Sequence, residues 1–67
     1  MLTARQQRFV EAYVANPNGA QAAVRAGYSA RTARVTASEN LRKPEIAAAI
    51  DRATKRRRTR AGQQDSR

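Results

Sequence analysis

Gly27, Tyr28 and Ser29 leave only a three-residue turn between two helical segments, and this spacing restricts the fold more than any other feature of the sequence. Glycine adopts the left-handed conformation that commonly ends a helix, and serine is favoured at the start of the next one. The stretch therefore predicts that one helix ends at Ala26 and another begins at Ala30. Two helices joined by so short a turn are typical of a helix-turn-helix.

Capping and turn signals place the helices before this turn. Thr3 and Gln6 form a T-x-x-Q pattern that resembles a capping box, ahead of a helix expected over residues 4–15. The cluster Asn16-Pro17-Asn18-Gly19 stops that helix, because the residue before proline is displaced from helical backbone angles. Its second asparagine is expected to cap a helix over residues 19–26. The expected buried stripe of this second helix consists of Ala20, Ala23 and Val24.

The third helix is expected from Ala30 to about Arg42, and Pro44 fits the first position of a fourth. The apolar stripe of the fourth helix consists of Ile46, Ala49, Ile50 and Ala53. The pattern ends at Thr54. We therefore predict an all-α helix-turn-helix domain of about four helices over residues 2–54, followed by a basic, flexible tail over residues 55–67 that is frayed helix and then disordered.

Length limits this chain to one small core. A domain of 67 residues buries only about 60% of the surface that its unfolded chain exposes, so its stability margin is thin and a partner or an oligomer is expected to help. The predicted core is padded by alanines. Its larger members are Leu2, Phe9, Val10, Tyr13, Val14, Val24, Tyr28, Leu41, Ile46 and Ile50.

The composition argues against enzymes, metal sites and membrane spans. Without cysteine or histidine the usual zinc ligands are missing, and the five acidic residues are scattered rather than paired. No phosphate-binding G-x-x-x-x-G-K-[ST] motif occurs, so we expect neither catalysis nor a cofactor. No apolar run approaches the roughly 20 residues of a membrane span, and the N-terminus lacks the apolar region of a secretory signal. The expected location is the cytoplasm.

The charge balance indicates a polyanionic partner. Fourteen Lys plus Arg residues oppose five Asp plus Glu, which gives a net charge of +9, and twelve of the fourteen are arginine. The planar guanidinium suits bidentate contact with phosphate or guanine. Double-stranded DNA is the favoured partner, while an anionic membrane or an acidic protein surface stays open as an alternative.

Helical periodicity divides the third helix into two faces. Ala30, Ala33, Ala37 and Leu41 are expected on the buried face. The opposite side carries long polar side chains, as a helix in the major groove of DNA requires. Its members are Arg31, Thr32, Val35, Thr36, Glu39 and Arg42, with Arg34 and Ser38 at one flank.

Each candidate contact also has an ordinary explanation. Arginines on a solvent face are usually only hydrated, and an outward Val35 alone would be a common surface residue. The ring of Tyr28 is expected to fill the angle between the second and third helices, and its hydroxyl could also reach a phosphate. The tail could add affinity without sequence preference, could be a linker, or could attract lipid. Its cations are Lys55, Arg56, Arg57, Arg58 and Arg60.

Three blocks of the sequence resemble the N-terminal domain of phage terminase small subunits. LTARQQRFVEAYV, NGAQAAVRAGYSARTA and ENLRKPEIAAAI follow the family patterns L-T-x-[KR]-Q-x-x-F-x-x-x-Y, N-x-x-x-A-A-x-x-A-G-Y-S and L-x-[NK]-P-x-[IV] in order, over residues 2–50. The resemblance implies that Arg31, Thr32 and Arg34 lie in a recognition helix. The scaffold positions that it implies are Ala23, Gly27, Tyr28, Ser29 and Ala33.

The resemblance also implies a role in packaging viral DNA. Small subunits of this family recognise the packaging-initiation site on the genome and recruit or regulate a large subunit that carries the ATPase and nuclease, and their domains typically ring an oligomerisation domain. Here only a basic tail follows Ile50. We therefore expect either a DNA-binding domain alone or a short form that assembles otherwise. A helix-turn-helix transcription regulator and an adaptor for an acidic protein remain the alternatives.

Overall fold

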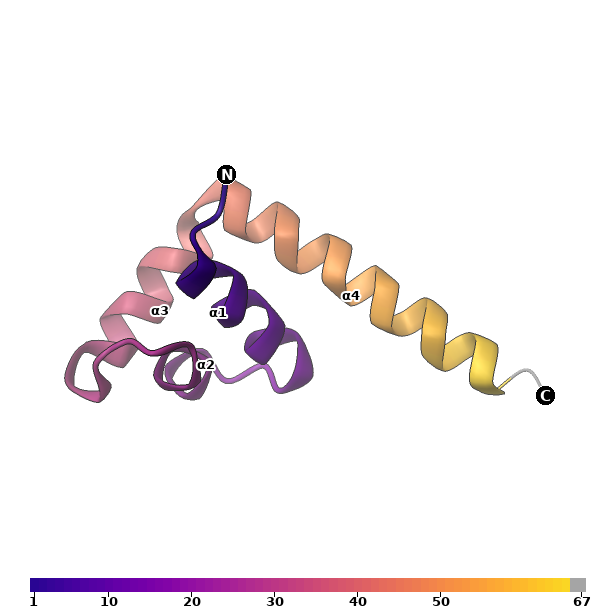
Figure 1. Ribbon diagram of the computed structural model, residues 1–67, viewed down its shortest axis with the longest axis horizontal. Helices are drawn as coiled ribbons and strands as arrows, with labels where there is room; N and C mark the ends of the chain where they lie inside the picture. Colours follow the sequence, from indigo (N-terminus) through magenta and orange to yellow (C-terminus); the bar gives the residue numbers. More distant parts are fainter. Residues whose placement is uncertain (66–67) are drawn as a thin grey trace.

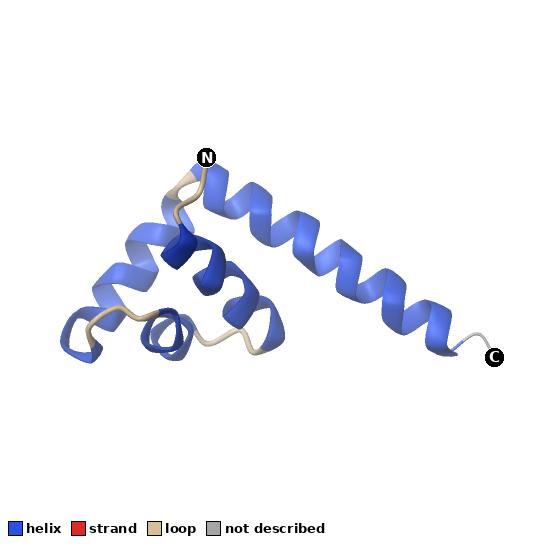
Figure 2. Cartoon of the chain, in the orientation of Figure 1, coloured by secondary structure: helices blue, strands red, loops and turns tan. Residues whose placement is uncertain are grey.

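The computed structural model describes the backbone of residues 1–65 and the side-chain environments of residues 1–58. Within these residues the chain forms four α-helices and one 3₁₀ turn, without strands (Figures 1 and 2). The elements in chain order are α1 (Ala4–Ala15), α2 (Gly19–Ala26), η1 (Ala30–Thr32), α3 (Ala33–Arg42) and α4 (Pro44–Asp65). The predicted all-α class and the order of four helices are confirmed.

The helix starts follow the predicted capping chemistry. The hydroxyl of Thr3 accepts a hydrogen bond from the Gln6 backbone N–H at 3.0 Å, and the Gln6 side chain accepts one from the Thr3 backbone N–H at 2.9 Å. Asn18 caps α2 in the same way, by accepting from the Gln21 backbone N–H at 3.1 Å. These bonds satisfy amide groups that have no partner inside the helix. The predicted boundaries of α1 and α2 are therefore confirmed.

Gly27 ends α2 in the left-handed conformation, with φ 104° and ψ 8°. The Tyr28 backbone N–H donates to the Ala23 carbonyl and the Gly27 N–H donates to the Val24 carbonyl, both at 3.0 Å. This pair of bonds is the Schellman arrangement, which satisfies carbonyls left free at a helix end. The chain thus leaves α2 in a direction that only a residue tolerant of positive φ permits.

The core lies between α1, α2 and the first half of α4. Phe9, Val10 and Ile46 are the largest fully buried side chains, and the ring of Tyr13 stacks on Phe9 with centroids 5.9 Å apart. α1 packs against both α2 and α4, and α4 also touches α3. The core is completed by partly buried Leu2, Val14 and Ile50. One apolar cluster therefore holds all four helices, as expected for a chain of this length.

Helices α2 and α3 approach closely because small residues face each other. Ala22, Ala23 and Ala26 of α2 and Ala33 and Ala37 of α3 are buried. A Cβ atom at Gly19 would lie 3.0 Å from the Cβ of Ala37. Glycine at the start of α2 thus leaves space for α3.

Three residues predicted to be buried lie at the surface instead, and one of them is Ala30, which is exposed at the start of the 3₁₀ turn. Val24 is 47% exposed and Leu41 is 36% exposed, whereas Asn40 is only 3% exposed. The buried face of α3 is therefore rotated from Leu41 toward Asn40. Similarly, α2 buries Ala22 and Ala26 in place of Val24, because α1 and α3 pack on either side of it. The Nδ2 atom of Asn40 has no hydrogen-bond partner.

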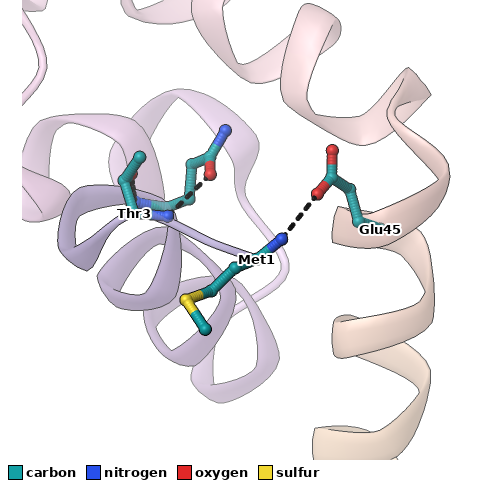
Figure 3. A network of polar contacts seen from close by, with 4 residues as sticks. Met1, Thr3 and Glu45 are labelled. Atoms are coloured by element: carbon teal, nitrogen blue, oxygen red, sulfur yellow. Dashed lines mark hydrogen bonds and ion pairs between the residues drawn. The ribbon is translucent and has the colours of Figure 1, made fainter.

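The C-terminal half of α4 extends away from the other helices (Figure 1). Ala53 is the last buried residue among those whose side chains are described, and the helix continues past Thr54 to Asp65. At its other end, the Met1 ammonium group lies 3.6 Å from the Glu45 carboxylate (Figure 3). The division into a domain over residues 2–54 and a tail stays a prediction, and residues 66–67 lie outside the described part of the chain.

Replacing Gly27 tests the left-handed turn. Gly27→Ala should lower the free energy of unfolding by about 1–2 kcal/mol, because a side chain with a Cβ is strained at this φ. Gly27→Asn should cost less, since asparagine tolerates this conformation better than alanine. Urea denaturation followed by circular dichroism measures both. Equal stability of all three proteins would contradict the turn geometry.

Asn40→Leu should stabilise the fold by about 1 kcal/mol. A buried N–H group without a partner carries a desolvation penalty of about 1–3 kcal/mol. Leucine has the same branching as asparagine and removes that penalty. Asn40→Asp is the matched control, and it should destabilise because it buries a charge. Thermal melts of the three proteins provide the comparison. A less stable leucine variant would show that the amide has a partner in solution.

Candidate nucleic-acid interface

The turn into α3 is built by Ser29. Its hydroxyl accepts a hydrogen bond from the Arg31 backbone N–H at 3.3 Å, and Ala30–Thr32 form a 3₁₀ turn before the α-helix begins at Ala33. The predicted helix from Ala30 is therefore tighter in its first turn. Thr32 occupies the N-cap position of α3 without a side-chain capping bond, so its exposed hydroxyl is not used by the helix.

The outward face formed by η1 and α3 carries most of the predicted contact residues. Arg31, Thr32, Arg34 and Arg42 are exposed, and Val35 is 60% exposed. Thr36 differs, because it is half-buried at the edge of the face that packs on the core. The same rotation that buries Asn40 accounts for this difference. Ser38, Glu39 and Leu41 are exposed beside the arginines.

The arginines of this face have no acidic partners among the described residues. The ion pairs found there join the Met1 ammonium group to Glu45 and Lys55 to Asp51, and neither involves arginine. Glu39 is the one carboxylate among the exposed residues of α3. The guanidinium groups of Arg31, Arg34 and Arg42 are thus free to bind an external anion, and arginine suits phosphate and guanine.

Tyr28 connects the turn to α1. Its ring is half-buried and packs against the core, while its predicted place in the angle between α2 and α3 stays a prediction. The guanidinium carbon of Arg5 lies 5.5 Å from the ring centroid, within the range of a cation–π contact. Arg5 was not among the predicted contact residues, because its contact with Tyr28 joins residues far apart along the chain. The contact of the Tyr28 hydroxyl with phosphate stays a prediction.

The cations of α4 lie apart from this face. Arg56, Arg57 and Arg58 are exposed beyond the last buried turn, and Lys55 lies 3.3 Å from Asp51 on the same helix. Arg56 lines two surface hollows of about 540 and 370 Å³ between α1 and α4, and Arg57 lines the smaller one. The side chain of Arg60 lies outside the described residues. The exposed arginines of α3 and the basic part of α4 therefore belong to separate parts of the fold.

The described residues lack two features that are typical of metal sites and of membrane-spanning helices. They contain no group of three or more acidic, histidine or cysteine residues that could hold a metal ion. No helix among them is long and apolar enough to cross a membrane.

The fold and this surface define a small helical domain in which a helix, a short turn and a second helix present unpaired arginines. The terminase small subunit family matches residues 2–66, so the chain belongs to that family. Terminase small subunits of Bacillus phages SF6 and rho15 are each 47% identical over 51 residues, which is 75% of this chain and 35% of theirs. The terminase small subunit of Bacillus phage SPP1 is 42% identical over 50 residues, which is 73% of this chain and 34% of the SPP1 protein.

The chain thus spans about a third of the length of these relatives. No solved structure is significantly similar to it. The family membership confirms the resemblance that the three sequence blocks indicated.

A chain that ends at Thr54 should keep a cooperative thermal transition. Among the residues of α4 whose side chains are described, Ile46, Ala49 and Ala53 are buried and residues 55–58 are exposed. The midpoint should therefore move by less than about 5 °C. A chain that ends at Ala48 is the control, and it should lose the transition with the second half of the apolar stripe. A broad transition in the longer truncation would place residues beyond Thr54 in the folding unit.

Proposed function

We propose that this chain is a DNA-binding part of a phage terminase small subunit, acting without catalysis in the host cytoplasm. Such a domain would recognise viral genome DNA to initiate packaging and would work with the large subunit that carries the ATPase and nuclease. The observation that carries the proposal is the outward face of η1 and α3, where Arg31, Arg34 and Arg42 have no acidic partner among the described residues.

The geometry of the turn supports a helix that enters the major groove. The first polar residues after the turn are Arg31, Thr32 and Arg34, and the N-terminal residues of a recognition helix are the ones that reach base edges. Arginine can donate two hydrogen bonds to guanine, and the hydroxyl of Thr32 can donate or accept. The methyl groups of Val35 suit contact with thymine.

The basic residues of α4 would supply a second kind of contact. Lys55 and the exposed Arg56, Arg57 and Arg58 concentrate positive charge where α4 extends away from the core. Charges of this kind bind phosphates through counterion release and do not distinguish sequences. The proposal therefore assigns sequence discrimination to α3 and general affinity to α4.

Arg34→Gln should weaken binding to duplex DNA. A contact to a base should cost about 1–3 kcal/mol on the preferred sequence, whereas a contact to phosphate should weaken all sequences alike. Glu39→Gln on the same helix is the matched control. It removes a negative charge from the face and should strengthen binding. Fluorescence anisotropy with labelled duplexes over a salt series measures both changes.

Three results would redirect the proposal. Absence of duplex binding at low salt would favour an adaptor for an acidic protein. Recognition of paired half-sites one helical turn apart by a dimer would favour a transcription regulator. Unchanged affinity in both variants, with binding retained, would remove α3 from the interface.

A further inference from the structure

We propose that Arg5 and Arg8 of α1, supported by the ring of Tyr28, form a binding site for a backbone phosphate of duplex DNA. The inference rests on the proposed function and adds a contact outside α3 and α4. Its location is a surface hollow of about 510 Å³ where the start of α1 meets the turn before α3. The hollow is lined by Thr3, Ala4, Arg5, Gln6, Arg8 and Tyr28.

The charge of this hollow distinguishes it from the two beside α4. Its lining contains two arginines and no carboxylate. The hollows between α1 and α4 include Glu45 in one case and Glu11 in the other. Neither Arg5 nor Arg8 forms an ion pair with any described residue. The two charges are therefore available to an anion from solvent.

The position of the Arg5 guanidinium is restrained by an aromatic surface. Its central carbon lies 5.5 Å from the centroid of Tyr28, whose ring is half-buried and packs against the core. A guanidinium over a ring keeps the N–H groups at its edge available for two parallel hydrogen bonds to phosphate oxygens. Because the side chain is partly ordered before binding, less conformational freedom is lost when the phosphate arrives.

Arg8 adds a second charge from the same side of α1. Residues three apart on a helix are neighbours, so Arg5 and Arg8 face one direction. The α1 residues that line the hollows beside α4 are Gln7, Val10, Glu11 and Val14. α1 therefore presents its two arginines on a face that is distinct from the one that meets α4.

The site adjoins the start of the proposed recognition helix. Tyr28 directly precedes Ser29, which accepts the hydrogen bond from the Arg31 backbone N–H. Phosphate contacts fix the orientation of a protein on the duplex, while contacts to bases discriminate between sequences. A phosphate held by Arg5 and Arg8 would thus set the position from which Arg31 and Thr32 approach the bases.

Salt titrations of the whole chain with random-sequence duplex DNA test this site. Arg5→Gln and Arg8→Gln should each make the slope of log affinity against log salt less negative by about 0.9, with a similar loss of affinity on every sequence. Arg52→Gln is the matched control. Arg52 is exposed on α4 and lines the hollow that contains Glu45, so its replacement should leave the slope unchanged.

Arg5→Lys distinguishes the effect of the positive charge from the effect of the planar guanidinium group. It retains the charge and should retain the slope, while affinity falls because lysine lacks the planar fork. Circular dichroism melts should show that all variants fold.

If the unaltered chain binds duplex DNA and the Arg5 and Arg8 variants keep its slope, or if Arg52→Gln changes the slope equally, the site is refuted and DNA binding stands. If the unaltered chain does not bind duplex DNA, the proposed function fails and this site fails with it.

Discussion

The contact among Phe9, Val10 and Ile46 supports the rest of the structure, because these are the largest side chains fully removed from solvent. Burial of each such side chain contributes about 1.5–3 kcal/mol, whereas an alanine removes far less apolar area. Phe9 and Val10 belong to α1, and Ile46 belongs to the first turn of α4. The largest buried side chains therefore come from the first and last helices, and α2 and α3 join the core through small residues.

This division of the core has a consequence for the surface. Helices α2 and α3 meet through alanines and Gly19, so they lie close together without large side chains between them. The long side chains of α3 then project outward, as arginines, Val35 and Glu39. A close packing of small residues on one side and long polar residues on the other suits a helix that contacts a partner across its full exposed face.

The helix boundaries could be predicted because they depend on local chemistry. The side chains of Thr3 and Asn18 accept hydrogen bonds from backbone N–H groups three residues later in the chain. The end of α2 depends on the positive φ of Gly27. The faces of the helices depend on neighbours that sequence periodicity does not contain. Periodicity assigned Leu41 to the core because it is apolar, yet the packing of α3 on α2 buries Asn40 instead. The contact between Arg5 and Tyr28 could not be predicted for the same reason, because Arg5 belongs to a helix that is distant from Tyr28 in the sequence.

Thr36, which was predicted to face outward, is half-buried, so only part of its side chain is exposed on the proposed interface. Arg31, Thr32, Arg34, Val35 and Arg42 remain on the exposed side, while Thr36 borders the core. A half-buried residue contributes to a partner contact mainly by holding its helix in place. The proposed DNA surface is therefore better described by three structural sources of positive charge: the outward face of α3, the start of α1 beside Tyr28, and the extension of α4.

Because these sources belong to different helices joined by one small core, the angle between α1 and α3 decides whether their charges can meet the same duplex. Gly27 ends α2 at the turn that leads into α3, and Tyr28 in the same turn packs against the core. The turn that shapes the fold therefore also contributes to the spacing of the proposed contacts.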